Sequence, residues 1–395
     1  MGGNVASGPG RGLEALSPRE AKLHGAPHTP NRMRILALMK IFVVRAWIVG
    51  AVMCSAACST PTGTLAEARQ TTTTGPSATG AILPPDDADA APPPITKALV
   101  SQGDRHTASQ AEELLFLGAA EKDPGVVTCR GEHDEAARIP CLLAARYAGD
   151  PAAARDALAL YARVGGVAGV LPDEDMDGGF RGRIHLVPQA PMGKERRHLA
   201  WITAANEDFD GFFIELARGA TAPLRYRFRD LAYRFFRSVK RTTPSAYADG
   251  WSVAYNVAGS LNTSADAVRE TLFHEIFHLD DAAHDDWSGR ALRPIFDAIV
   301  QKCGARTTCL GPFAPNDTMV RGGTYYAFQP NNGDAVHEYA AELALRYYRE
   351  NRASMREEAL KKPGFKCGPP ENLRAWSALS AEFFGGVDRT PTCTQ

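Results

Sequence analysis

The sequence of 395 residues predicts an α+β fold. Segments with the alternating apolar pattern of strands gather between about 180 and 257. Two long amphipathic segments with good N-caps follow at 264–283 and 334–350, and an Ala-rich stretch at 108–165 also has helical character. Strands that come before the main helices, rather than alternating with them, are typical of α+β proteins.

The composition is that of an ordinary globular protein. Hydrophobic residues make up 44% and charged residues 23% of the chain, which is enough apolar material for a sizeable core. The formal net charge is −1. We expect no nucleic-acid partner, because such binding depends on a surplus of basic residues that neutralises phosphates.

The first segment, 1–57, is expected to direct export rather than to fold. Residues 46–57 form an uncharged, mostly apolar stretch, AWIVGAVMCSAA, preceded by basic residues and ending in small ones. That pattern is typical of a secretory signal. The stretch is shorter than the about 20 apolar residues that a membrane-spanning helix needs. Met33 or Met39 is a more usual translation start than Met1.

The end of this segment resembles a bacterial lipoprotein signal. Ser55-Ala56-Ala57 precede Cys58, which would become the lipidated N-terminus, although such signals usually have Leu where Ser55 stands. Ordinary cleavage after Ala57 is the alternative. Both interpretations export the protein. Lipidation of Cys58 would anchor it in the cell envelope, at the outer membrane or the cell surface.

Two further regions precede the main domain. Residues 58–100 are rich in Thr, Pro and Ala and are expected to form a flexible tether. Residues 101–170 are expected to form a helical N-terminal region, in which Asp150 caps a helix and Pro151 takes its first position. Residues 171–395 then form the main domain.

The cysteines beyond the signal are even in number and fall into three local pairs. In an exported protein such a pattern indicates disulfides. The most economical pairing is Cys129–Cys141, Cys303–Cys309 and Cys367–Cys393. None of them has the CxxC spacing of a zinc knuckle, so we expect no structural zinc.

Several elements are expected between 180 and 260. The segments 183–187 and 198–204 have strand patterns, and 211–217 fits a strand or a helix. Segment 227–241 has apolar residues at helical spacing and predicts an amphipathic helix. In WSVAYNV, 251–257, large apolar residues alternate with smaller ones, which predicts a strand.

The segment with the clearest chemistry contains His274, Glu275 and His278. Ser264 is a suitable N-cap, and no Gly or Pro follows it before residue 283. Residues four apart on a helix differ in direction by only about 40°, so both imidazoles face one cation. Glu275 lies about 100° around the helix and can reach a water on the metal. This HExxH pattern predicts a zinc site with two His ligands and a general base.

A catalytic zinc takes a third protein ligand. Glu338 is the favoured candidate, on a helix capped by Asp334, and Glu342 one turn later can accept the free N–H of a ligating His. His284 completes a metzincin-like HExxHxxDxxH, but Asp281 stands where metzincins have the Gly that turns the chain. A helix that continues through Asp281 points His284 away from the metal and carries Asp281 a turn beyond it.

These motifs resemble the catalytic domain of the anthrax toxin lethal-factor family, which includes clostridial Pro-Pro endopeptidases. HEIFHLDD (274–281) resembles its HExxH segment, and EYAAE (338–342) resembles its ExxAE segment. The resemblance implies a zincin-like fold of the gluzincin type over roughly 225–350, with Glu338 as the zinc ligand. It also implies that strand 251–257 is the edge strand that lines the cleft and pairs with an extended substrate.

The chain departs from this family in the residue expected to stabilise the oxyanion. The family has a catalytic Tyr seven residues before the ligand Glu, where this chain has Asn331. Tyr326 lies 12 residues before Glu338 and is the favoured replacement, with Tyr325 or His337 as alternatives.

Together these features predict an exported zinc metalloendopeptidase that hydrolyses protein or peptide substrates. A metal-activated water attacks the peptide bond, with Glu275 as the general base. Two other hypotheses stay open. One is a non-catalytic surface-binding lipoprotein that retains the fold, although such a role does not require Glu275. The other is a metzincin-type peptidase that uses His284.

Overall fold

The computed structural model describes most of the chain after residue 105. The described residues are 106–394, apart from 179–180, 321, 331–332 and 361. The predictions for the signal, for Cys58 and for the tether at 58–100 fall outside the described residues. Within the described part, no helix is long and apolar enough to cross a membrane.

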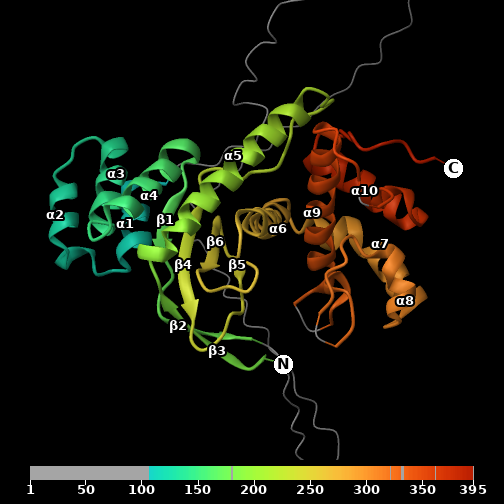
Figure 1. Ribbon diagram of the computed structural model, residues 1–395, viewed down its shortest axis with the longest axis horizontal. Coiled ribbons are helices and arrows are strands. Elements are labelled where there is room, and N and C mark those ends of the chain that lie inside the picture. The colour runs from blue at the N-terminus through green and yellow to red at the C-terminus, as the bar shows by residue number, and fades with distance from the viewer. Residues whose placement is uncertain (1–105, 179–180, 321, 331–332, 361, 395) are drawn as a thin grey trace, which may run out of the picture. The chain divides into compact units, whose positions relative to one another are not determined.

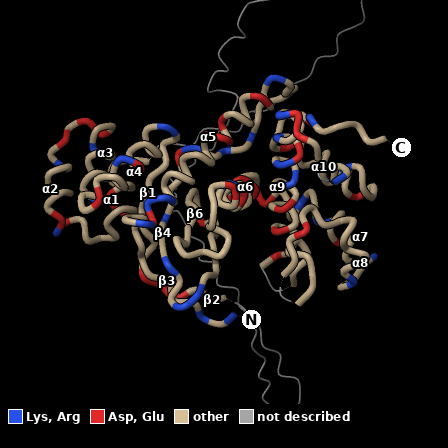
Figure 2. The backbone as a smooth tube through the Cα atoms, viewed as in Figure 1, with Lys and Arg blue, Asp and Glu red and all other residues tan. Residues whose placement is uncertain are grey.

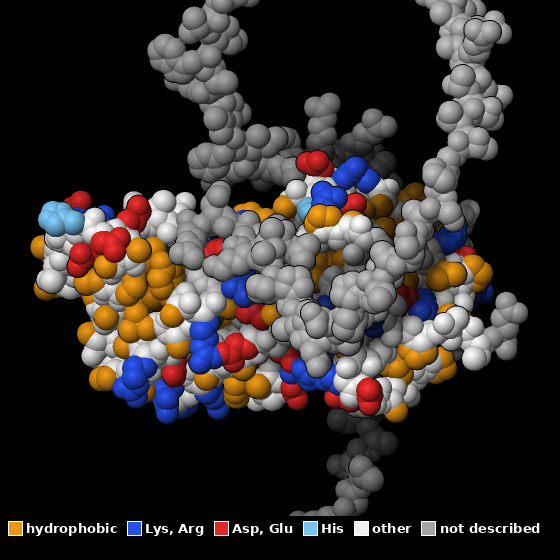
Figure 3. Space-filling model, turned by 90° about the horizontal axis from the view of Figure 1, so that it is seen from above, with side chains coloured by type: hydrophobic (Ala, Val, Ile, Leu, Met, Phe, Trp, Pro, Cys, Tyr) orange, Lys and Arg blue, Asp and Glu red, His pale blue; other side chains and the backbone are white. Residues whose placement is uncertain are grey.

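The described chain begins with a group of helices, as the Ala-rich composition predicts. They are α1 (Ala108–Phe116), η2 (Ala120–Lys122), α2 (Pro124–Arg130), α3 (Glu135–Arg146) and α4 (Pro151–Val164). The predicted cap of α4 is confirmed, because the Asp150 side chain accepts hydrogen bonds from the N–H groups of Ala152 and Ala153. Pro151 takes the first position of the helix, also as predicted. On the surface, apolar side chains gather over this helical end (Figure 3).

A mixed sheet follows these helices. Its strands are β1 (Val167–Val170), β2 (Glu174–Asp177), β3 (Arg183–Pro188), β4 (Ala232–Ser238), β5 (Ala246–Ala248) and β6 (Ser252–Asn256). The order is β2-β3-β4-β6-β5, and β1 pairs with β4 as well. The β1–β4 and β4–β6 pairs are parallel, and the other pairs are antiparallel. Helices and strands together confirm the predicted α+β class, and β3 confirms the strand expected at 183–187.

The helix predicted at 227–241 was wrong, because this segment contains β4. Phe235 and Phe236 are both fully buried but lie in separate apolar clusters, since successive side chains of a strand point to opposite faces. A central strand covered on both faces has a nearly continuous apolar run, and such a run also contains helical spacings.

The predicted edge strand was also misplaced. Segment 251–257 does form a strand, β6, but β6 lies between β4 and β5. All five residues of β6 are buried, as expected for an interior strand. The edge is the short strand β5, which the sequence analysis did not identify.

The strand predicted at 198–204 was wrong as well. This segment and 211–217 both belong to one helix, α5 (Arg197–Ala217). Its buried residues include Leu199, Ile202 and Phe209, which recur at helical spacing over the whole element. A window of seven residues is too short to separate the two periods, and only the full length shows the helix.

Two long helices, α6 (Ala265–Ala283) and α9 (Ala335–Met355), carry the predicted motifs. Ser264 and Asp334 cap them as the sequence predicts, each accepting a backbone N–H of its first turn. Helix α6 packs against α5 and the sheet on one side and against α9 on the other (Figure 1). The remaining helices are η4 (Gly193–Arg196), η5 (Ser288–Leu292), α7 (Arg293–Cys303), α8 (Thr307–Leu310), η6 (Gly311–Phe313), η7 (Tyr326–Phe328), η8 (Phe365–Cys367) and α10 (Pro370–Phe383).

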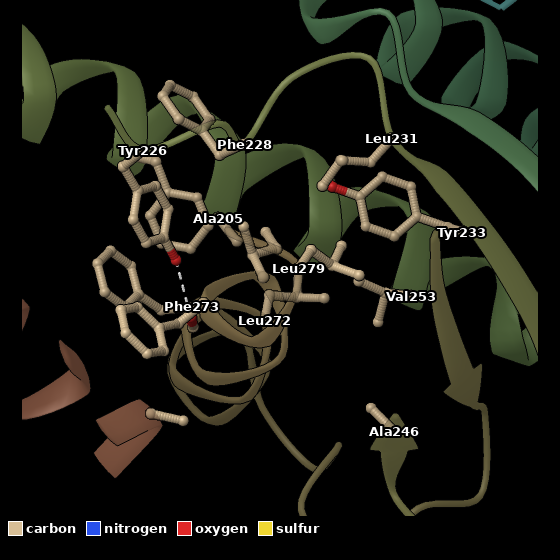
Figure 4. Close-up of a cluster of buried hydrophobic side chains, with 14 of the residues drawn as sticks. Ala205, Tyr226, Phe228, Leu231, Tyr233, Ala246, Val253, Leu272, Phe273 and Leu279 are labelled. Atoms are coloured by element: carbon tan, nitrogen blue, oxygen red, sulfur yellow. Dashed lines mark hydrogen bonds between the residues drawn. The ribbon is translucent and has the colours of Figure 1, made fainter. Parts of the chain in front are cut away.

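Aromatic residues form the core behind α6. Tyr226 stacks on Phe273 with ring centroids 4.8 Å apart, and its hydroxyl donates to the Phe273 carbonyl at 2.8 Å (Figure 4). Phe213 stacks on Tyr226 from α5. Phe273 directly precedes His274, so this packing fixes the helix at the start of the HExxH motif. The larger of the two buried apolar clusters contains residues from Ala108 to Val387 and so extends across the domain boundary predicted near residue 170.

The six described cysteines pair as the sequence predicts. The pairs are Cys129–Cys141, Cys303–Cys309 and Cys367–Cys393, with Cα atoms 5.6, 5.3 and 5.3 Å apart. These separations lie within the range of native disulfides. Oxidation of the pairs in the cell follows from the predicted export and stays a prediction with it.

An acidic residue on α5, Asp208, ties this helix to α9. Its carboxylate accepts two hydrogen bonds of 2.8 Å from Arg352 and one of 2.6 Å from Arg356, and Tyr348 donates a further one. Burial alone would raise the pKa of Asp208, but the hydrogen bonds from Arg352 and Tyr348 outweigh it and lower the pKa to about 2.

We therefore expect Asp208→Asn to destabilise the fold by about 2 kcal/mol at pH 7. The folded pKa lies below the unfolded one, so this stabilisation is present above about pH 4 and lost as the pH falls toward 2. By pH 3 the difference between wild type and variant should shrink to about half. Urea unfolding at both pH values measures it, with Asp266→Asn, whose side chain is 81% exposed, as the control. An equal difference at pH 7 and pH 3 would contradict the assignment.

Candidate metal centre

Helix α6 brings His274 and His278 together. They lie four residues apart, and their ring centroids are 4.9 Å apart with the ring planes nearly perpendicular. The two Nε2 atoms approach to 3.2 Å. His274 is buried and His278 is half-buried, so the pair faces inward rather than toward bulk solvent.

Helix α9 adds Glu338 to this pair. Its Oε2 lies 3.2 Å from Nε2 of His274 and 3.8 Å from Nε2 of His278. The three ligand atoms thus lie within 4.8 Å of one another. Acidic residues mark the parts of α6 and α9 that face each other (Figure 2). The structure therefore brings together the three residues that the sequence predicts as zinc ligands.

The arrangement of these atoms fits a tetrahedral zinc site. Ligand atoms bound to one zinc at about 2.0–2.2 Å lie about 3.3–3.6 Å apart, which is close to the distances here. The Glu338 Oε2 atom is buried and, among the described residues, has no hydrogen-bond partner. Two imidazole nitrogens with free lone pairs and a carboxylate oxygen repel one another at this range unless a proton or a cation lies among them.

Glu342 orients the first histidine. Its Oε1 lies 3.4 Å from Nδ1 of His274, and the side chain is almost fully buried. A proton on Nδ1 that points to this carboxylate leaves the lone pair of Nε2 directed at His278 and Glu338. This geometry is compatible with the supporting role that the sequence analysis predicts for Glu342, which stays a prediction.

The charges of the site influence one another strongly. Burial lowers the pKa of His274, but the facing carboxylates of Glu338 and Glu342 outweigh it and raise that pKa well above its usual value. Burial raises the pKa of Glu338, but its proximity to His274 and His278 outweighs burial and lowers that pKa. Both directions of shift favour a proton on the His274 ring when no metal is bound. A metal has to displace this proton, so its affinity falls with falling pH.

Glu275 lies next to this cluster without belonging to it. It is half-buried, and burial raises its pKa, while the neighbouring His274 and His278 act in the opposite direction. A carboxylate with a raised pKa is a stronger base and accepts a proton from a water more readily.

Among the three candidates for the oxyanion residue, the ring of Tyr326 lies beside the site. Its centroid is 5.9 Å from that of His274. The Tyr325 hydroxyl instead lies against Gly311, where an added Cβ would approach it to 3.0 Å. His337 is paired through Nε2 with Oδ1 of Asp286 at 2.5 Å. Asn331, at the family's Tyr position, falls outside the described residues.

The metzincin-type ligand, His284, points away from the cluster. It caps the C-terminus of α6, its Nδ1 lies 2.8 Å from Oε1 of Glu382, and its ring stacks on Phe383. Asp281 accepts hydrogen bonds from the backbone and the hydroxyl of Ser288 at 2.7 and 2.5 Å. Both positions follow from α6 continuing to Ala283, as the absence of Gly at 281 predicts.

A second group of metal-type ligands, Asp281, Asp286 and His337, also lies within 4.8 Å. Its atoms already have hydrogen-bond partners, because Ser288 occupies both Asp281 oxygens and His337 occupies Asp286. In the first cluster, by contrast, Glu338 Oε2 makes no hydrogen bond to another described residue and lies only against the ring nitrogens of the two histidines. The second group is therefore explained by its own hydrogen bonds and needs no metal.

No family model matches the chain, and no curated protein or solved structure that was compared with it is significantly similar. The assignment of a function consequently depends on the residues themselves.

The sequence analysis did not identify one buried residue that contacts the site, Asn316. It donates to the main-chain carbonyl of Glu342. Its partner is 26 residues away in the chain, and an isolated Asn in a loop has no pattern that would distinguish it.

Proposed function

We propose that this chain is a zinc-dependent endopeptidase. The observation that carries the proposal is the convergence of His274, His278 and Glu338 from two helices, with a buried carboxylate oxygen that has no hydrogen-bond partner among the described residues. Three protein ligands of the types His, His and Glu leave a fourth position, as catalytic zinc sites do. The adjacent Glu275 supplies the base that a purely structural zinc site does not need.

The proposed reaction is hydrolysis of an internal peptide bond. A zinc ion held by the three ligands would lower the pKa of a bound water toward about 7 and polarise the substrate carbonyl. The Glu275 carboxylate accepts the proton of the attacking water and then donates it to the leaving amine. The Tyr326 hydroxyl donates a hydrogen bond to the oxygen of the carbonyl as negative charge develops there.

The substrate is proposed to be an extended peptide. In the described part of the chain, β5 pairs with β6 through one edge only and packs near α6. An extended segment can add to such an edge through main-chain hydrogen bonds. On this proposal β5, rather than β6, binds the substrate. The sequence predictions of export and of a lipid anchor at Cys58 would place the enzyme at the cell envelope.

The test of this function is Glu275→Gln. We expect the variant to retain one zinc per chain, because Glu275 is not a ligand, and to lose roughly 10²- to 10⁴-fold in rate, the usual contribution of a general base. Zinc is measured by elemental analysis. Activity is measured on a peptide library, with and without a chelator. Glu371→Gln, a substitution on α10, is the control.

A wild-type protein that holds zinc and cleaves no peptide would instead support the non-catalytic binding role. A Glu275→Gln variant with full activity would exclude this residue as the base.

A further inference from the structure

A buried asparagine, Asn316, attaches the loop that leads to Tyr326 to helix α9. Asn316 is only 4% exposed. Its Nδ2 donates to the main-chain carbonyl of Glu342 at 2.8 Å, and its Oδ1 accepts from Nη1 of Arg349 at 2.7 Å. The two contacts use opposite ends of the amide, so neither Asp nor Leu can reproduce both.

Arg349 in turn is fixed by α6. Its Nε donates to Oε1 of Glu270 at 2.8 Å, and its Nη2 pairs with Oε2 of the same carboxylate. Such a two-point pair fixes the plane of the guanidinium as well as its position. Glu270 lies on α6 one turn before His274. A continuous series of contacts therefore runs from α6 through α9 to Asn316.

The segment between Asn316 and Tyr326 is a hairpin, described apart from residue 321. The N–H of Tyr326 donates to the Thr318 carbonyl at 2.8 Å, and the N–H of Val320 donates to the Thr324 carbonyl at 2.9 Å. The first of these bonds places Tyr326 next to the residues that follow Asn316. The position of Tyr326 therefore depends on that of Asn316, because these hydrogen bonds join the two sides of the short hairpin.

The anchor point is the residue that also supports the metal centre. Glu342 accepts the Asn316 amide at its main-chain carbonyl, and its carboxylate lies 3.4 Å from Nδ1 of His274. The ring of Tyr326 lies 5.9 Å from that of His274. One residue of α9 thus sets both the imidazole and the hairpin that faces it.

We propose that Asn316 is a positioning residue that holds Tyr326 beside His274 by anchoring the hairpin to Glu342. Arg349 and Glu270 keep its amide in the orientation that donates to α9. This inference rests on the proposed function for its effect on turnover, whereas the anchoring itself does not. A displacement of about 1 Å of a group that stabilises a transition state can cost on the order of 10²-fold in rate.

The experiment compares Asn316→Ala and Asn316→Asp in the zinc-loaded full chain. The Asp variant keeps the size and the acceptor for Arg349 and removes only the donor to Glu342. For both we expect kcat to fall about 10- to 100-fold, with KM within about twofold and zinc still at one per chain. The matched control is Asn351→Ala, which removes a fully buried Asn of α9 that bonds to Tyr347 and Arg389 instead.

A double variant shows whether Asn316 acts through Tyr326. The double variant Asn316→Ala/Tyr326→Phe should have a kcat within about twofold of that of Tyr326→Phe alone. The reason is that both substitutions act on the same hydroxyl, that of Tyr326. Multiplicative losses would mean that Asn316 acts elsewhere, and the proposal would be wrong.

Hydrogen exchange tests the anchor without any activity. The amides of Val320 and Tyr326 should exchange at least about tenfold faster in both Asn316 variants, while the exchange of the α6 amides stays unchanged. In the control variant Asn351→Ala, the exchange of Val320 and Tyr326 should stay at the wild-type rate. Unchanged exchange in the hairpin would overturn the proposal even if the enzyme is active. Conversely, suppose that exchange is faster in the Asn316 variants but the wild-type protein cleaves no peptide. That result would support the anchoring role of Asn316 and refute the proposed function.

Discussion

Replacing both His274 and His278 with Ala should reduce bound zinc from about one per chain to none and abolish peptidase activity. The two imidazoles supply two of the three converging ligands, and a single remaining carboxylate cannot hold the ion. Metal catalysis contributes several kcal/mol to the transition state, so we expect a loss of at least about 10³-fold in kcat/KM. Elemental analysis of the purified protein and a fluorogenic peptide assay measure the two effects.

The control for this experiment is His133→Ala, because His133 lies exposed between α2 and α3, away from the cluster. It should keep the zinc and the activity of the wild type. Stoichiometric zinc retained by the double variant would mean that the ion is bound elsewhere in the chain.

The second large effect distinguishes the two candidates for the third ligand. Glu338→Gln should weaken zinc affinity strongly and suppress turnover, because a neutral amide is a poor ligand for zinc. His284→Ala should leave both unchanged, since its ring is stacked on Phe383 and paired with Glu382. Glu342→Gln should retain the metal but lower affinity or rate by about 10- to 100-fold, the usual effect of removing a partner of a ligating His.

Zinc dissociation constants from competition with a chromophoric chelator, measured together with kcat, decide this point. The metzincin-type hypothesis requires the reverse order, in which His284→Ala loses the metal and Glu338→Gln is nearly silent. That result would contradict the ligand set His274, His278 and Glu338.

Much of the helical structure could be predicted because its signals are local. Ser264, Asp334 and Asp150 each accept a backbone N–H of the turn that follows, so a cap is specified by a few neighbouring residues. The strands were harder to predict. Segment 227–241 was assigned to a helix because a central strand covered on both faces lacks the alternation that reveals a half-buried strand.

The order of the strands could not be predicted from the residues of each strand. Segment 251–257 has the composition of a strand wherever it lies in a sheet, but its residues do not show which segments pair with it. Only pairing with β4 on one side and β5 on the other makes β6 interior. The strand at this edge of the sheet is β5, whose three residues are too few to form a recognisable strand pattern.

The sequence by itself determined the chemistry of the candidate site and the separation of its parts. The spacing of His274 and His278 places both rings on one face of a helix whatever surrounds it, because helical geometry is local. The lack of Gly at 281 likewise directs His284 away. Only the tertiary structure decided which distant residues meet that face. The packing of α9 against α6 brings Glu338 to the histidines, and the hairpin anchored by Asn316 brings Tyr326 rather than Tyr325 beside His274. These contacts join residues tens of positions apart, so they depend on how whole elements pack, which no short stretch of sequence encodes.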